Sequence, residues 1–241
     1  MDDRPLASQR EPHLRRRRRP AAVHRLLPAI GMAAMLSVLG GCSLFVMAGK
    51  MVFGDPVQEA PFKRVTRVDL TEGEHEVLVV ASTPASVKQD MPSADLVITE
   101  QVSRLLETEG VSIFPSKKVL NWVDDRGGRW GSPQEIAEAF PEVDYIILID
   151  IDNLTHHEDN SPTLLRGHVT GNVSAYEVET INGEPSASPA FSQTFKGKYP
   201  QLYPKQSHQI SERTFQKAFL DRVCRKIAQM FYDYHARDAV L

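Results

Sequence analysis

Cysteine is scarce in this chain, since only Cys42 and Cys224 occur among its 241 residues. A framework of several disulfides is therefore excluded, and the fold has to depend on a hydrophobic core. The common catalytic signatures are also lacking: the sequence contains no P-loop pattern, no H-E-x-x-H zinc pattern and no G-x-S-x-G nucleophile elbow. These absences favour a protein that is not an enzyme and that carries no cofactor.

The apolar segment that precedes the two glycines near the amino terminus is shorter than a membrane-spanning helix. It runs from Leu26 to Leu39, which is 14 residues without a charge. At ~1.5 Å per residue it would extend about 21 Å, which is less than the ~30 Å hydrocarbon core. Five consecutive arginines, Arg15 to Arg19, precede it. A basic region followed by a short apolar segment is typical of a secretory signal peptide.

A lipobox-like sequence stands where this apolar segment ends. Leu39, Gly40 and Gly41 precede Cys42, and small residues before a cysteine suit recognition by a lipoprotein signal peptidase. We expect Cys42 to carry diacylglycerol and palmitate-type acyl chains as the new amino terminus. Two chains suffice for stable membrane anchoring. Ser43 follows, and by resemblance to envelope lipoproteins the lack of an aspartate there favours the periplasmic face of the outer membrane over the inner membrane.

Cleavage before Cys42 divides the chain into three predicted parts. Residues 1–41 form the signal peptide, residues 42–61 form a lipidated tether, and residues 62–241 form one periplasmic domain. Residues 1–41 hold eight arginines and three acidic residues, so the mature chain has 28 − 8 = 20 basic and 31 − 3 = 28 acidic residues and a net charge of −8. This charge argues against nucleic acid as a partner. No internal disulfide remains, because Cys224 is then the only free thiol.

The first half of the predicted domain alternates strands and helices. Glu76 to Ser82 reads as a buried strand, and Ser93 starts a helix that Gly110 ends. Val111 to Pro115 predicts a second strand. Ser132, with proline next and glutamate three residues on, predicts another helix start. The apolar run from Val143 to Ile151 predicts a central strand that is covered on both faces.

The second half predicts a hairpin and a long helix. Apolar and polar residues alternate strictly from Leu165 to Tyr176, which indicates an antiparallel strand with one exposed face. Asn182 and Gly183 supply turn chemistry, and Ala190 to Gly197 returns as the partner strand. Ser211 to His235 carries an apolar stripe at helical spacing. The expected fold class is α/β: a mixed sheet covered by helices, in the order β-α-β-α-β, then a hairpin, then a C-terminal helix.

This order resembles a superfamily of bacterial envelope lipoproteins. The lipobox, the strand "VLVVAS", the strand "VSIFP" and the strand "VDYIILIDI" carry the resemblance. The superfamily includes the curli-secretion pore subunit, the lipoprotein activators of penicillin-binding proteins and the TolB amino-terminal domain. The resemblance implies a non-enzymatic protein that acts through protein contacts. The chain departs from the pore-forming members because it lacks a clear apolar membrane hairpin.

A polar segment follows the predicted central strand and contains the candidate metal ligands His156, His157, Asp152 and Glu158. Histidine and carboxylate side chains are common zinc ligands. Adjacent histidines on an extended backbone point to opposite sides, however, and the spacing matches no zinc motif. We therefore expect a solvated loop and no bound metal, with a metal-dependent envelope hydrolase as the alternative.

A glycine-containing segment presents tryptophan and arginine side chains. Trp122, Arg126, Arg129 and Trp130 lie within nine positions, and such residues are enriched at the energetic centres of protein interfaces. The competing interpretation is that the tryptophans only fasten this loop to the domain. The preferred function is thus a lipid-anchored adaptor or assembly factor that binds an envelope protein. A homo-oligomer, including an oligomeric export-pore subunit, remains a further alternative.

Overall fold

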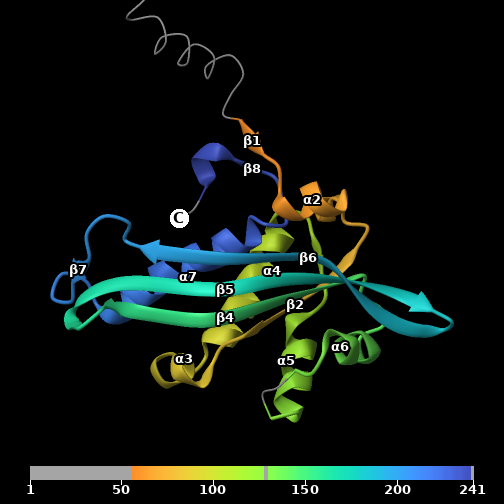
Figure 1. Cartoon of the computed structure of the whole chain (residues 1–241), viewed down its shortest axis with the longest axis horizontal. Coiled ribbons are helices and arrows are strands. Elements are labelled where there is room, and N and C mark those ends of the chain that lie inside the picture. The colour runs from red at the N-terminus through yellow and green to blue at the C-terminus, as the bar shows by residue number, and fades with distance from the viewer. Residues whose placement is uncertain (1–55, 128–129, 240–241) are drawn as a thin grey trace, which may run out of the picture. The chain divides into compact units, whose positions relative to one another are not determined.

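A mixed sheet of six strands forms the centre of the computed structural model, which describes residues 56–127 and 130–239 (Figure 1). The predicted α/β fold class is confirmed. The sheet has the order β3-β2-β4-β5-β6, and β7 pairs with β5 in addition. The strands are β2 (Glu76–Ser82), β3 (Ser112–Ile113), β4 (Tyr145–Glu158), β5 (Ser161–Ile181), β6 (Glu184–Tyr199) and β7 (Lys205–Gln206).

The strands that are apolar throughout lie in the parallel part of the sheet. β2 pairs in parallel with β3 and with β4, so that Leu78 lies opposite Ile146. Five successive residues of β2 are buried, as are the first five of β4. A strand buried on both faces requires apolar side chains at every position. The prediction of a doubly covered strand from Val143 onward is therefore confirmed for the first part of β4.

Two groups of helices cover the two faces of the sheet. One face packs against α4 and α7, and the other packs against α5 and α6 (Figure 1). The larger helices are α4 (Ala94–Thr108), α5 (Ser116–Asp125), α6 (Pro133–Ala139) and α7 (Glu212–Ala228). The short ones are α2 (Pro61–Thr66), α3 (Ala85–Asp90) and the 3-10 turns η1 (Leu70–Glu72) and η2 (Ala236–Asp238).

Local signals end and begin these elements as predicted. Gly110 has φ +96° after α4, and the amide of Val111 donates to the carbonyl of Leu106, which closes a Schellman motif. The Ser132 hydroxyl accepts a hydrogen bond from the amide of Glu135 at the start of α6. The turn at residues 182–183 has positive φ at both positions and joins β5 to β6.

The long C-terminal helix ends earlier than the predicted His235. α7 stops at Ala228, and Tyr234–His235 form strand β8, which pairs antiparallel with β1 (Val57–Gln58). The apolar stripe misled the prediction because Met230 and Phe231 are buried in the core without being helical. Their backbone makes turn-type hydrogen bonds instead, and the carbonyl of Met230 accepts from the amide of Phe62.

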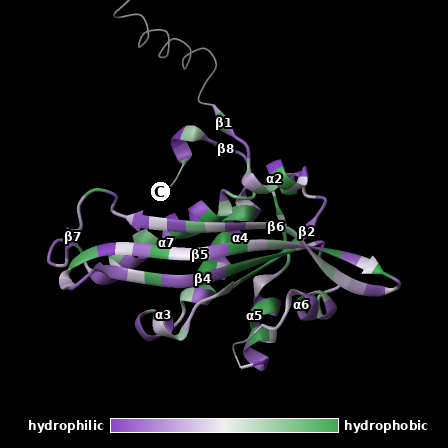
Figure 2. Ribbon diagram, in the orientation of Figure 1, coloured by the Kyte–Doolittle hydropathy of each residue, from purple (hydrophilic) through white to green (hydrophobic). Residues whose placement is uncertain are grey.

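The segment after Ile151 continues as a strand to Glu158, so the prediction of a solvated loop joining two strands is wrong for residues 152–158. β4 continues to Glu158 and pairs with β5, although its register shifts three times between Ile151 and Glu158. Such irregularities interrupt the alternation of apolar and polar residues along a strand. The sequence of this segment therefore resembles that of a loop. Figure 2 shows this mixture of hydrophobic and hydrophilic residues along β4 and β5.

Candidate functional site

The predicted lipidation site lies outside the described residues. This holds for Cys42, for the recognition residues Leu39, Gly40 and Gly41, and for Arg129. Among residues 56–127 and 130–239, no helix is both long and apolar enough to cross a membrane. Membrane attachment through Cys42 therefore remains a prediction from the sequence.

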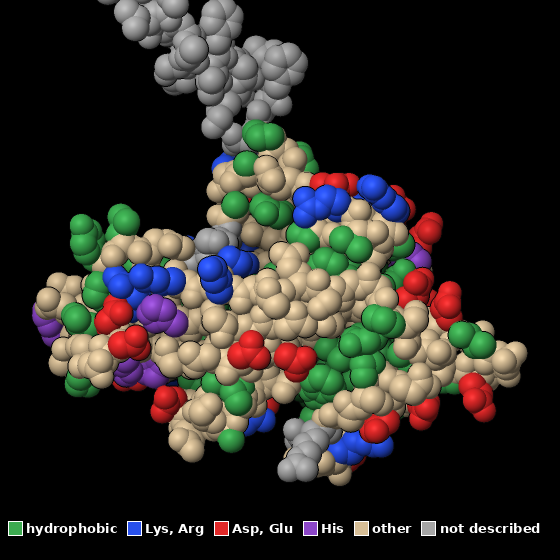
Figure 3. Space-filling model, in the orientation of Figure 1, with side chains coloured by type: hydrophobic (Ala, Val, Ile, Leu, Met, Phe, Trp, Pro, Cys, Tyr) green, Lys and Arg blue, Asp and Glu red, His purple; other side chains and the backbone are tan. Residues whose placement is uncertain are grey.

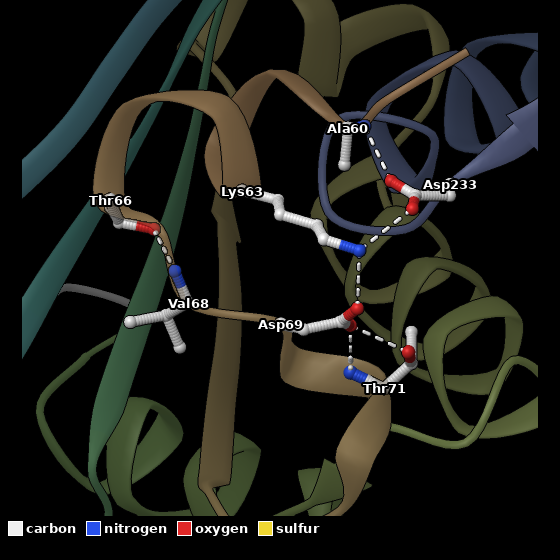
Figure 4. Close-up of polar contacts among 7 residues, drawn as sticks. All are labelled: Ala60, Lys63, Thr66, Val68, Asp69, Thr71 and Asp233. Atoms are coloured by element: carbon white, nitrogen blue, oxygen red, sulfur yellow. Dashed lines mark hydrogen bonds and ion pairs between the residues drawn. The ribbon is translucent and has the colours of Figure 1, made fainter.

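The amino-terminal end of the described chain is fastened to its carboxyl-terminal end (Figure 4). The ammonium group of Lys63 contacts Asp69 at 2.6 Å and Asp233 at 2.8 Å, and Asp233 also accepts from the amide of Ala60. Hydrogen bonds to Asp233 and then Asp69 raise the pKa of Lys63, and the Lys63 hydrogen bond is the main cause that lowers the pKa of Asp69. Phe62 is fully buried beside this network. Residues 57–58, within the predicted tether, also pair with β8 as strand β1.

The two tryptophans flank the smaller of the two core clusters. Trp122 of α5 packs edge-on against Phe140 with ring centroids 5.6 Å apart, and the guanidinium of Arg126 lies 4.3 Å from the centroid of Trp122. Trp122 and Trp130 are both partly buried, so each contacts the core and also reaches the surface. We call the partly buried hydrophobic residues on this cluster the tryptophan patch. Its members are Trp122, Val123, Trp130, Tyr176, Val178 and Ala187.

No described helix covers the remainder of this face of the sheet, over β4, β5 and β6 (Figure 1), and its polar side chains include Thr170, Asn172 and Ser192. Asn172 donates to Ser174 at 2.9 Å and to Ser192 on the neighbouring strand at 3.3 Å. Figure 3 shows acidic side chains near the middle of this face and hydrophobic side chains gathered beside α5 and α6. Partial burial, and next the charge of Asp152, raises the pKa of Asp150. We call this surface the bare sheet face.

The candidate metal ligands separate into two groups. Asp152 is exposed, and Glu158 forms an ion pair with Arg166 at 2.8 Å, so neither joins the histidines. His156 and His157 lie together, with ring centroids 4.2 Å apart, because the register shifts around His157 break the strict alternation of the strand. The expectation that they point to opposite sides is therefore wrong.

Glu212 completes the histidine cluster, and sequence reasoning missed it. The ligand atoms of His156, His157 and Glu212 all lie within 4.8 Å of one another. Glu212 is the first residue of α7 and stands 56 positions after His156. Its only local signal is an acidic residue after the capping Ser211, which is typical of ordinary helix starts.

Cys224 is not a reactive site. Its side chain is fully buried in α7, and it forms no disulfide. Burial is the main cause that raises the pKa of its thiol to about 12. Because the thiolate is the reactive form, this thiol is inert at neutral pH.

Comparison with known proteins finds no matching protein-family model and no matching curated protein. Among solved structures, the chain is similar to a PelC dodecamer from Paraburkholderia phytofirmans, with a TM-score of 0.37 and 12% identity over 73% of this chain and 96% of that one. Lipoprotein GNA1162 from Neisseria meningitidis gives 0.35 and 16%, over 64% and 98%. Protein XCC0632 from Xanthomonas campestris gives 0.39 and 12%, over 73% and 88%.

These similar structures thus include a bacterial lipoprotein and a dodecameric assembly. TM-scores of this size establish neither a common family nor a common function. The resemblance to the superfamily of the curli-secretion pore subunit stays a prediction, and the function of this chain has to be argued from its own residues.

Proposed function

We propose that the protein is a lipid-anchored lipoprotein of the bacterial envelope, held at the periplasmic face of the outer membrane, and that it acts without catalysis as an adaptor or assembly factor. The observation that carries this proposal is the sequence Leu39-Gly40-Gly41-Cys42 at the end of a short uncharged segment that follows five arginines. A cysteine in that position is the substrate for diacylglycerol transfer.

The length of the tether limits where the domain can work. From Cys42 to Pro56, the first described residue, is 14 residues. At ~3.3–3.6 Å per residue a fully extended chain of that length reaches about 50 Å. The contacts of Lys63 and Phe62 join the end of the tether firmly to the domain. An acylated Cys42 therefore keeps any partner surface of the domain close to the bilayer.

The bare sheet face and the tryptophan patch form the proposed contact surface for an envelope protein. The patch offers partly buried aromatic rings with an arginine stacked on one of them, which is the composition of interface hot spots. The polar strands beside it supply the hydrogen-bonding surround that such interfaces have. Each tryptophan then fastens its segment to the domain and also contacts the partner, because one part of the ring packs inward and another part reaches solvent.

Substituting Cys42 tests the anchor. Cys42→Ala should abolish incorporation of labelled palmitate and move the protein from the membrane fraction to the soluble periplasmic fraction. Cys224→Ala is the matched control, since a buried cysteine in α7 should leave labelling and fractionation unchanged. A Cys42→Ala protein that stays labelled and membrane-bound would contradict the proposal.

Crosslinking in intact envelopes, followed by mass spectrometry, tests the adaptor role. Arg126→Ala should reduce the yield of the crosslinked partner while costing at most about 0.5–1 kcal/mol of stability, because exposed cation–π contacts are weak. Arg64→Ala on α2 is the control, being exposed and remote in sequence from the patch. A crosslink to the same chain, with a large assembly in detergent, would favour the oligomeric alternative instead. Equal yields in both variants would argue against this surface.

A further inference from the structure

Two histidines and one carboxylate meet where the far part of β4 crosses the first turn of α7. His156 and His157 belong to the irregular end of β4, and Glu212 is the first residue of α7. His156 is 4% exposed, whereas half of the Glu212 side chain is accessible. The cluster is therefore anchored in the core on one side and open to solvent on the other.

The three side chains point to a common volume. The carboxylate of Glu212 is in close contact with Nε2 of His156, and the two imidazole rings lie 4.2 Å apart between centroids. One ligand atom from each residue lies within 4.8 Å of the other two. The amide nitrogen of Gln216 is 3.2 Å from the same Nε2 and 3.4 Å from Glu212, so it supports both groups from the next turn of the helix.

A histidine–glutamate pair alone leaves part of this arrangement without an explanation. Such a pair accounts for Nε2 of His156 and for the Glu212 carboxylate. It gives no reason for a second imidazole beside the first.

We propose that His156, His157 and Glu212 form a binding site for a divalent transition-metal ion, and that Zn²⁺ is the ion that this donor set fits. Two imidazoles and one carboxylate are a three-ligand zinc set, which leaves the fourth position open. His156 would bind the ion through Nε2, the ring nitrogen that faces Glu212, and the Glu212 carboxylate would bind the ion in place of its present contact with that nitrogen. The ion would then join the end of β4 to α7.

This inference is independent of the proposed anchor. A site without metal affinity leaves the lipidation of Cys42 and the contact surface untouched. A metal-loaded site gives the domain a rigid link between the hairpin and the helix, and it leaves an open coordination position for a ligand from a partner.

Titration of the metal-free, full-length mature protein in detergent tests the site. ZnCl₂ should bind with a stoichiometry of one and a dissociation constant of about 1 μM or tighter. It should also raise the unfolding temperature, because the ion binds only the folded arrangement. Co²⁺ should give the visible absorption bands of a tetrahedral site.

Variants assign the ligands. His157→Ala, at a partly exposed position, should weaken zinc binding by about 100-fold or more while the circular dichroism spectrum stays unchanged. Glu212→Gln removes the carboxylate ligand and should weaken zinc binding by about 100-fold or more. His156→Gln keeps a polar side chain of similar reach at the buried position and should abolish the cobalt bands.

His208→Ala is the matched control, because His208 is exposed and is not one of the three residues of the cluster. It should bind zinc like the wild type. The proposal is overturned if the wild-type protein shows no saturable binding below about 100 μM. Binding that His157→Ala and Glu212→Gln leave unchanged also overturns it, since the ion then sits elsewhere.

Discussion

The two faces of the sheet are made from alternate residues of the same strands, and they differ in what covers them. Under α4 and α7, β5 presents Leu165, Val169 and Val173, which are all buried. On the opposite face, the next residues along β5 are polar and partly or fully exposed, such as Thr170 and Asn172. The comparison teaches that α4 and α7 bury one face of the sheet along β5, whereas the opposite face is buried only beside α5 and α6.

On the covered face, α7 packs very close to the backbone of β5. An added Cβ at Gly167 would lie 2.5 Å from the ring of Phe219 in α7, and one at Gly171 would lie 2.4 Å from the carbonyl oxygen of Asp150. Small residues on β5 therefore let large aromatic rings lie directly on the sheet. The bare sheet face has no such interlocking, because no described element packs on its polar strands.

Removing an aromatic ring from the covered face should have the largest effect on stability. Phe219→Ala should lower the free energy of unfolding by about 3–5 kcal/mol, because Phe219 is fully buried and its loss leaves a cavity. Ser192→Ala on the bare face should change it by at most about 0.5 kcal/mol. Urea denaturation measures both. Similar losses from the two substitutions would remove the distinction between the faces.

Adding a methyl group to the covered face should have an intermediate effect. Gly167→Ala should destabilise by about 1–3 kcal/mol, because the new Cβ overlaps the ring of Phe219. Combining it with Phe219→Leu should recover part of that loss, which a double-mutant cycle measures directly. If the losses of unfolding free energy in the two single variants simply add in the double variant, overlap with the Phe219 ring is not the cause of the destabilisation by Gly167→Ala.

The smallest expected effect concerns Asp150, a group on the bare sheet face whose pKa is shifted. The pKa of Asp150 is raised in the folded protein by burial and by Asp152, so its ionisation opposes folding. The stabilising protonated form is present below the unfolded pKa and is lost as pH rises through the higher folded pKa. Asp150→Asn should therefore raise the melting temperature at pH 7 but not near pH 3. Asp152→Asn should give a smaller increase, because its charge is the lesser cause.

Much of the fold could be predicted because its signals are local. Gly110, Ser132 and the Asn182-Gly183 turn act through their own backbone conformation and nearest hydrogen bonds, so no distant residue can cancel them. The end of α7 could not be predicted in this way. Phe231 keeps the apolar period of the helix, but it is buried through contact with Phe62, which lies far away in the sequence.

The candidate sites show the same division. The lipobox is a contiguous motif that a processing enzyme reads in an extended chain, so its prediction needs no folded structure. The histidine cluster needs a strand irregularity to bring His156 and His157 together and a helix start 56 positions later to add Glu212. No local pattern encodes either condition, which is why Asp152 and Glu158 seemed equally good candidates.

The sequence alone determined the order of the main elements and the strands that have one polar face, because these follow from the period and chemistry of neighbouring residues. The tertiary structure decided where α7 ends, how the first described residues join the last ones, and which side chains share a site. Those outcomes depend on contacts between segments far apart in the chain, and the energy of such contacts is set only when the segments pack together.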